Sequence, residues 1–257
     1  NLCRGDKTII SDLIDQGDVE FVEGDIRYLP KLLDVCDGVD MINHQAADCI
    51  NKSLQNPIES FEINILGTTN VFEAARIKNI VKVVFASSAS VFGEPKSLPM
   101  NENTPLNPIT PYCISKATIE NIAKYYFTYF GINHVGLRYF NVYGPRQNID
   151  AYYTSVIILF LKKIMNNEPP IIDGDGKQSM DFIHLNDVVN ANVMALEKEI
   201  KAEVFNIGTN RSTSIAELVN ILIDSCGKKS IKPRFTGKKS IVSRRKTDYS
   251  KAQSLLG

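Results

Sequence analysis

The fold of this chain is decided by the stretch VVFASSASVFG, residues 83–93, and by the PYCISK that follows it at residues 111–116. The first three residues are apolar and small residues follow them, which is typical of a buried parallel strand that ends at a cleft. Tyr112 and Lys116 are four residues apart at the head of a segment with helical spacing, so they share one helix face. We therefore predict that this pair and Ser88, at the strand end, form a group that handles protons.

A lysine beside a tyrosine changes the chemistry that the tyrosine can perform. An unperturbed tyrosine has a pKa near 10, so lowering it to about 7 requires about 4 kcal/mol of stabilisation of the phenolate. An ammonium about 4 Å away supplies that order of energy at an effective dielectric constant near 20. Lys116 would therefore make Tyr112 a base at neutral pH. The alternative is a chance surface pair, since Y-x-x-x-K is a common spacing, and the strand that ends in Ser88 argues against it.

Composition bounds the class of protein. The chain has 257 residues, 44% of them hydrophobic, which suffices for one large domain or a domain with a smaller lobe. Its formal net charge is zero, so the chain as a whole has no electrostatic attraction to nucleic acid or to an anionic membrane. The longest apolar run, VIILFL at residues 156–161, is too short to span a membrane, and no signal peptide opens the sequence.

The five cysteines are odd in number, scattered and without a C-x-x-C pair. Structural disulfides and zinc are therefore not expected. Asp173 and Asp175 lie in a Gly-rich turn and are interpreted as turn formers, so we expect no metal site. Together these features predict a soluble protein of a reducing compartment, the cytoplasm.

Strands and helices alternate in the first half of the chain. This βαβαβ pattern predicts a parallel sheet wrapped by helices, with ligands at the C-terminal ends of the strands. The expected strands cover residues 19–26, 37–47 and 81–88, and the expected helices cover residues 28–36 and 57–79.

Regularity falls after residue 142, where long excursions leave the sheet. They indicate a smaller lobe that faces the strand ends. We place the nucleotide-binding domain at residues 1–141 and 182–208, and the lobe at residues 142–181 and 209–257. The elements expected here are a strand at residues 132–146, helices at 151–167, 185–197 and 213–226, two extended pieces within 169–185, and a strand at 204–208.

Eight motifs then follow one another along the chain: GDI, HQAA, NILGT, SSASVFG, YCISK, LRYFNVYGPR, GDGKQSMDFIH and VFNIG. In this order the sequence resembles the extended short-chain dehydrogenase/reductase family, and within it the nucleotide-sugar epimerases of the UDP-glucose 4-epimerase type. The resemblance implies a Rossmann-like, doubly wound parallel sheet with a smaller C-terminal substrate lobe. It also implies NAD as cofactor, a UDP-linked hexose as substrate and a homodimer, with neither nucleic acid nor membrane as partner.

The resemblance assigns catalysis to Ser88, Tyr112 and Lys116. Tyr112 would take the proton of the sugar 4-hydroxyl while hydride leaves C4 for NAD, and the transient 4-keto sugar would take the hydride back on its other face. Lys116 would also hold the nicotinamide ribose. The cofactor residues implied are Asp25 and Ile26 at the adenine, and Gln45, Ala46 and Ala47 at the diphosphate and ribose. Asn64 would tie the neighbouring helix to that segment, Tyr139 and Phe140 would lie near the nicotinamide, and Ser87 is also implied as a cofactor residue. The substrate residues implied are Ser88, Ser90 and Asn141.

The residues after Ser88 bear on the type of reaction. Sugar dehydratases and decarboxylases of this family resemble each other in placing a Glu just after the catalytic Ser or Thr, and here the positions hold Ala89, Ser90 and Val91. The resemblance therefore favours an epimerase. A reductase or dehydratase of nucleotide sugars is the alternative within the enzymes, and a non-catalytic nucleotide-binding module is the alternative outside them.

The sequence departs from the family pattern in three places. The Gly-rich fingerprint that follows a first strand is absent, and the sequence stops at SLLG, so we expect an inactive fragment that binds NAD poorly. Met180 stands where many members carry an arginine, and Lys238 stands in place of another arginine. We expect Arg244 or Arg245 to supply the lost charge to the substrate diphosphate.

Overall fold

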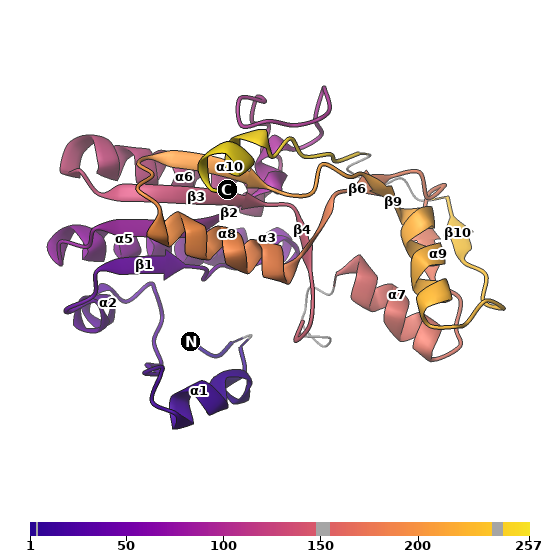
Figure 1. The fold of residues 1–257 in the computed structure, drawn as a ribbon, viewed down its shortest axis with the longest axis horizontal. Coiled ribbons are helices and arrows are strands. Elements are labelled where there is room, and N and C mark those ends of the chain that lie inside the picture. Colours follow the sequence, from indigo (N-terminus) through magenta and orange to yellow (C-terminus); the bar gives the residue numbers. More distant parts are fainter. Residues whose placement is uncertain (4, 148–154, 238–243) are drawn as a thin grey trace. The chain divides into compact units, whose positions relative to one another are not determined.

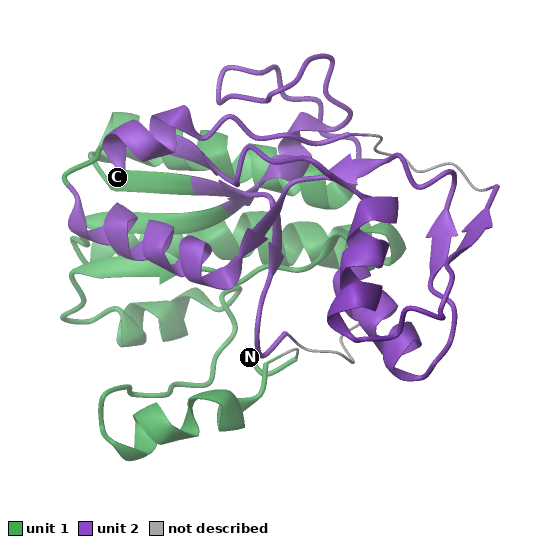
Figure 2. Cartoon of the chain, turned by 45° about the vertical axis from the view of Figure 1, so that its right-hand side comes forward, with its two compact units in different colours: residues 1–86, 110–136, 199–203 green, residues 87–109, 137–198, 204–257 purple. Residues whose placement is uncertain are grey.

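The computed structural model describes residues 1–3, 5–147, 155–237 and 244–257 (Figure 1). These residues form two compact units, which Figure 2 shows in green and purple. The limits of the units differ from the domain limits expected above, which stay a prediction about where the ligands bind. Unit 1 comprises residues 1–86, 110–136 and 199–203, and unit 2 comprises residues 87–109, 137–198 and 204–257.

The main sheet has the strand order β1-β2-β3-β8. Strand β2 ends at Ser88 and runs parallel to β1, with Met41 opposite Lys82 and His44 opposite Phe85. The apolar run at residues 83–85 is completely buried, as its composition predicts. The strands of this sheet are β1 (Met41–His44), β2 (Lys82–Ser88), β3 (Asn133–Tyr139) and β8 (Glu203–Ile207).

Helix α6 (Pro111–Phe130) is the longest helix in the described part of unit 1. Thr110 caps it by accepting a hydrogen bond from the backbone N of Cys113, and Pro111 occupies the first turn, where a missing N–H costs nothing. Gly131, with φ of 70°, ends it in the left-handed region. The other helical elements are η1 (Lys7–Ile10), α1 (Ser11–Asp15), α2 (Leu29–Val35), α3 (Ile50–Gln55), α4 (Pro57–Phe61), the π-helical turn η2 (Glu62–Leu66) and α5 (Gly67–Ile77).

Unit 2 contains short strand pairs and three longer helices among its described residues. Strand β4 runs parallel to β7, β5 runs parallel to β10, and β6 runs antiparallel to β9. Unit 2 has an apolar core of its own, in which helices α7 and α9 pack together and Ile164, Ile172 and Val219 are buried. The elements are η3 (Ala89–Phe92), β4 (Asn141–Tyr143), α7 (Val156–Met165), β5 (Ile171–Asp173), β6 (Ser179–Met180), β7 (Phe182–His184), α8 (Leu185–Glu197), β9 (Thr213–Ser214), α9 (Ile215–Ser225), β10 (Arg234–Thr236) and α10 (Ser250–Leu255).

Three expected elements differ from those observed. Residues 19–26 form no strand, because none of the described strands pairs with them and a strand needs a hydrogen-bonded neighbour. The helix expected at residues 57–79 is divided into α4, η2 and α5 by the π-helical turn. The strand expected at residues 132–146 is interrupted at Phe140, and residues 151–154 of the next expected helix lie outside the described residues.

Two histidines of unit 1 are buried among apolar groups. The Nε2 atom of His44 lies 2.9 Å from the hydroxyl of Thr68, and burial, reinforced by the charge of Lys116, lowers the pKa of His44 to about 3. Burial also lowers the pKa of His134 to about 4, against opposing effects of an Ile132 backbone hydrogen bond and nearby carboxylates. Both rings are therefore neutral in the folded chain at pH 7.

These buried histidines predict that the free energy of unfolding falls as the pH falls below about 6.5. The unfolded chain binds a proton on each histidine at its ordinary pKa, and the folded chain does not, so each contributes a slope of up to about 1.4 kcal/mol per pH unit. Urea unfolding at pH 7.5 and pH 5.0 measures the effect. We expect the double variant His44→Asn, His134→Asn to have a flatter pH dependence, and an equal slope in both proteins would contradict this assignment.

Candidate active site

The predicted pair Tyr112 and Lys116 lies on the first turns of α6. The ammonium of Lys116 is 5.7 Å from the centroid of the Tyr112 ring, so spacing by four residues does place both groups on one face. The backbone around Tyr112 is held on both sides. Its N–H donates to Ser53 Oγ at 3.2 Å, and its carbonyl accepts a hydrogen bond from Ser115 Oγ at 2.8 Å.

Lys116 is buried, with 3% of its surface exposed. Its Nζ donates to the carbonyl of Ala86, near the end of β2, at 2.7 Å. Burial lowers the pKa of Lys116 to about 8, and the carboxylate of Glu120 opposes this shift. An ammonium has three N–H donors, so within the described part of the chain this bond leaves two for a ligand.

Asn64 connects the segment after β1 to the first turns of α6. Its Oδ1 accepts a hydrogen bond from the backbone N of Asp48 at 2.7 Å, and its Nδ2 donates to Ser115 Oγ at 3.0 Å. Asn64 is 1% exposed and lies in the π-helical turn, a distortion that is frequent at functional sites. The expected link between the helix and this segment is therefore present. The neighbouring Gln45 and Ala46 are exposed and Ala47 is half-buried, as a surface open to a ligand requires.

Asp25 lies in the loop that precedes α2. Its carboxylate accepts hydrogen bonds from the backbone N, Nε and Nη2 of Arg27 and, at 2.6 Å, from the side-chain amide of Asn1. The Arg27 guanidinium holds the pKa of this carboxyl well below its usual range. The Asn1 donor is an NH2 group, the same type of donor as the exocyclic amine of adenine. Asp25 thus fits the adenine end of the cofactor chemically.

Ile26, the other expected adenine contact, faces inward. It packs against the core of unit 1, and a Cβ at Gly67 would lie 2.6 Å from its side chain. Asn70 fixes this loop, because its Nδ2 donates to the carbonyls of Ile26 and Arg27 at 3.1 and 3.0 Å. Sequence reasoning missed Asn70. The feature of the sequence that could have indicated Asn70 is an amide side chain directly before the apolar residues that the helix buries.

Ser88 lies in unit 2, at the start of the turn η3. Its Oγ accepts a hydrogen bond from the backbone N of Ser90 at 3.2 Å, so as far as the described residues are concerned its own proton is available to a ligand. Ser90 Oγ is buried and has no hydrogen-bond partner among the described residues, and Ser87 is 2% exposed. Gly93 ends the turn with φ of 59°, and a Cβ there would lie 2.2 Å from the carbonyl oxygen of Asn107.

The YFN segment also lies in unit 2. The hydroxyl of Tyr139 donates to Asn192 Oδ1 of α8 at 3.0 Å, and Phe140 is buried. Asn141 donates through Nδ2 to the carbonyl of Asp181 at 2.9 Å. Asn141 alone of these three lines the cavity described next.

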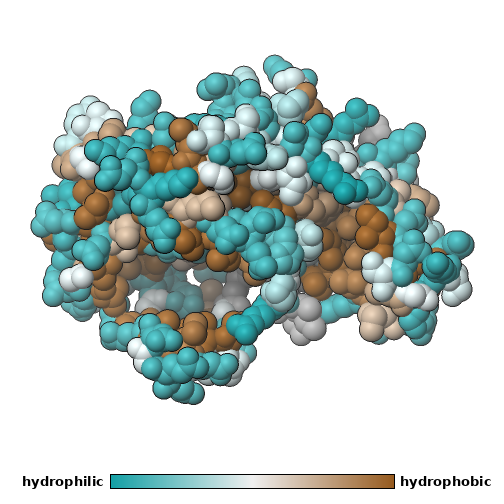
Figure 3. Space-filling model, viewed as in Figure 1, coloured by the Kyte–Doolittle hydropathy of each residue, from teal (hydrophilic) through white to brown (hydrophobic). Residues whose placement is uncertain are grey.

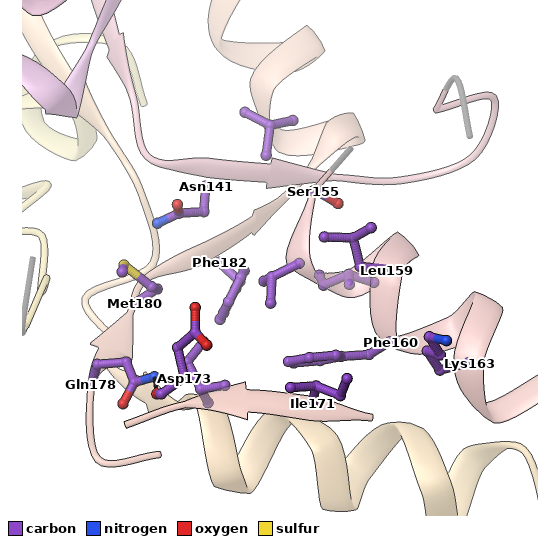
Figure 4. Close-up of a pocket in the computed structure, with 14 residues that line it drawn as sticks. Asn141, Ser155, Leu159, Phe160, Lys163, Ile171, Asp173, Gln178, Met180 and Phe182 are labelled. Atoms are coloured by element: carbon purple, nitrogen blue, oxygen red, sulfur yellow. Dashed lines mark hydrogen bonds between the residues drawn. The ribbon is translucent and has the colours of Figure 1, made fainter. Parts of the chain in front are cut away.

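A cavity of about 450 Å³ opens between β4, α7 and the strands β5 to β7 (Figure 4). Phe160 and Phe182 form apolar walls, while the carboxylate of Asp173 points inward and Asn141 adds a polar group to the lining. Apolar walls with a few polar groups are typical of small-molecule sites. Figure 3 shows apolar side chains gathered over α7, where Leu159 and Met165 are exposed. Sequence reasoning named Asn141 as a substrate residue and missed the rest of the lining; it had noted Met180 only as the loss of an arginine.

The two arginines expected at the substrate diphosphate differ in their surroundings. Arg244 is exposed. Arg245 is 8% exposed, and its guanidinium donates to the backbone carbonyls of Ala89 and Gly93. Arg244 is therefore the better placed of the two for a ligand, and Lys238 lies outside the described residues.

Comparison with known proteins identifies the family. Residues 4–208 match the NAD dependent epimerase/dehydratase family. The chain belongs to this family. It is 40% identical over 259 residues to a protein of Methanocaldococcus jannaschii described as a putative UDP-glucose 4-epimerase, and the match covers 99% of this chain and 82% of that protein.

Solved structures agree with the family. The UDP-N-acetylglucosamine 4-epimerase of Methanobrevibacter ruminantium M1 superposes with a TM-score of 0.94 at 29% identity, covering 100% of this chain and 82% of that one. A dTDP-glucose 4,6-dehydratase of Streptomyces venezuelae, solved with NAD, has a TM-score of 0.89 at 27% identity, covering 98% and 78%. The expected family, the α/β fold and the NAD cofactor are therefore confirmed. None of the described helices is both long and apolar enough to cross a membrane.

The environment of Lys116 predicts a lysine that titrates near pH 8. We expect the NMR signal of ¹³Cε-labelled Lys116, assigned by its loss in Lys116→Arg, to shift with a midpoint at about pH 8. Glu120→Gln removes the charge that opposes the shift and should lower the midpoint further. A midpoint above pH 10 in the parent protein would show that the ammonium is not desolvated.

Proposed function

We propose that the protein is an NAD-dependent 4-epimerase of a nucleotide sugar, and that its substrate is a UDP-hexose. The observation that carries the proposal is the buried Lys116 ammonium, which lies beside the Tyr112 ring and has N–H donors to spare among the described residues. Such a cation stabilises a phenolate and so makes Tyr112 a base. The two similar 4-epimerases support this reaction class.

In the proposed mechanism, Tyr112 removes the proton of the sugar 4-hydroxyl and later returns it. Ser88 donates a hydrogen bond to the same oxygen. Its proton can serve this purpose because Ser88 Oγ is the acceptor, not the donor, in its hydrogen bond with the Ser90 N–H. Lys116 stabilises the phenolate and binds the ribose hydroxyls of the cofactor. NAD, when bound, supplies the acceptor for the hydride from C4. Asp25, with Asn70 fixing its loop, would hold the adenine end.

The turn after Ser88 favours an epimerase over the dehydratase that also appears among the similar structures. Ala89 and Val91 are buried apolar residues, and Ser90 carries a hydroxyl. Loss of water from the sugar needs an additional acid and base beside the reacting carbons. This turn, residues 89–92, offers no carboxylate for that step.

The distribution of charge supports an anionic substrate on unit 2. By sequence, unit 2 has 18 Lys and Arg against 12 Asp and Glu, whereas unit 1 has 11 against 17. A positive field raises the local concentration of a nucleoside diphosphate. We propose that the cavity beside Asn141 takes the nucleotide and that Arg244 pairs with the diphosphate.

We also propose a homodimer that works in the cytoplasm. All five cysteines are free, which suits a reducing compartment. Helices α4 and α6 and the π-helical turn η2 pack together in unit 1 and carry exposed apolar side chains, which a second copy would cover. These are Ile58 at 73%, Leu66 at 49%, Ile114 at 40% and Tyr125 at 49% exposure.

Substrate and reaction are tested together with the full-length enzyme. We expect a panel of UDP-, dTDP- and GDP-sugars, followed by NMR, to give 4-epimers of a UDP-hexose without net consumption of NAD. Tyr112→Phe should lower kcat by about 10²- to 10⁴-fold and keep the fold. Tyr129→Phe, on the same helix and 72% exposed, is the matched control and should be fully active. A 4-keto-6-deoxy product would instead establish a dehydratase.

The oligomeric state is tested by light scattering after size exclusion. The double variant Ile58→Glu, Ile114→Glu should be a monomer, because each charge would be buried in the proposed contact. Val81→Glu, whose 65% exposure lies between those of Ile114 and Ile58 but which is outside the face, should remain a dimer. A monomeric parent protein would exclude the homodimer.

A further inference from the structure

Arg245 is a buried arginine that binds the chain itself. Its Nη1 donates to the carbonyl of Ala89 at 2.6 Å and its Nη2 to the carbonyl of Gly93 at 3.3 Å. These carbonyls lie at the two ends of the turn that follows Ser88. Burying a guanidinium is costly unless its donors are satisfied, so these bonds constrain both the arginine and the turn.

The carbonyl of Ala89 and the N–H of Ser90 belong to the same peptide group. That N–H is the donor that holds Ser88 Oγ, at 3.2 Å. Because a peptide group is planar, fixing its carbonyl also fixes the direction of its N–H. A charged donor on the carbonyl also polarises the peptide and strengthens the N–H as a donor. Arg245 thus acts on the Ser88 hydroxyl through one rigid group.

The backbone of Arg245 is hydrogen-bonded to the segment that forms part of the cavity wall. Its N–H donates to the carbonyl of Ser179 at 2.8 Å, and its carbonyl accepts a hydrogen bond from Ser212 Oγ at 3.0 Å. Ser179 stands between Gln178 and Met180, which both line the cavity. One residue therefore connects the cavity of unit 2 with the peptide that orients Ser88.

We propose that Arg245 is a positioning residue for Ser88 rather than a ligand of the substrate diphosphate. It orients the Ala89–Ser90 peptide, so that the serine accepts from that N–H and directs its own proton to the sugar oxygen. This inference rests on the role of Ser88 in the proposed function. The sequence had left Arg244 and Arg245 equivalent, and burial and bonding now separate them.

A double-mutant cycle in the full-length enzyme tests the proposal. We expect Arg245→Met to lower kcat by about 10- to 100-fold with KM changed by less than about threefold, because the loss arises in the transition state. Ser88→Ala should lower kcat similarly, and the double variant should be within about twofold of Ser88→Ala alone. Arg244→Met, the contrast, should raise KM and leave kcat near the parent value. Arg245→Lys, which retains a charge but not the fork, should restore part of the loss.

Three outcomes would overturn the proposal. Additive losses in the double variant would mean that Arg245 acts independently of Ser88. A raised KM with unchanged kcat in Arg245→Met would make it a substrate ligand. A Ser90 amide that exchanges hydrogen at the parent rate in Arg245→Met would show that the peptide does not depend on the arginine. The exchange measurement needs no turnover, so it tests the inference even where the parent enzyme acts on none of the sugars, a result that would refute the proposed function alone.

Discussion

The burial of one ammonium group, that of Lys116, is the constraint on which the site in unit 1 depends. A lysine in apolar surroundings loses its hydration, and the chain tolerates it only where a strong acceptor is near. The carbonyl of Ala86 is that acceptor, at 2.7 Å, and it is available because β2 approaches its end at this point. This bond does not fully replace the lost hydration, and burial therefore lowers the pKa of Lys116 to about 8. An apolar side chain at this position would avoid the desolvation penalty, so stability alone does not explain a lysine here.

The rest of unit 1 holds the tyrosine beside that ammonium. The helix starts at a threonine cap and a proline, so Tyr112 lies in its first turn, where the backbone N–H has no partner within the helix and instead donates to Ser53. Asn64 reaches this turn through Ser115. The π-helical turn that contains Asn64 disturbs helical regularity, a cost that is repaid by an amide able to bond in two directions.

Periodicity predicted much of this arrangement, because it depends on contacts between near neighbours in sequence. The pairing of Tyr112 with Lys116 follows from helical spacing, and the burial of residues 83–85 follows from an unbroken apolar run. Contacts between distant segments carry no such signal. Arg245 bonds to Ala89, 156 residues away, and nothing in SRRK distinguishes it from Arg244. The prediction of a strand at residues 19–26 was wrong for the same reason, because a strand-like local sequence does not show whether a neighbouring strand is present to pair with it.

The two units fix the proposed catalytic groups by different means. Unit 1 places Tyr112 and Lys116 on one rigid helix, where the backbone itself sets their separation. Ser88 stands at the end of a strand, and the four-residue turn after it is too short to stabilise itself. Such a turn needs a contact from outside, and a guanidinium that binds both of its ends at once meets this need with a single side chain. The orientation of the serine is therefore a property of the tertiary structure, whereas the spacing of the tyrosine and lysine is a property of the helix.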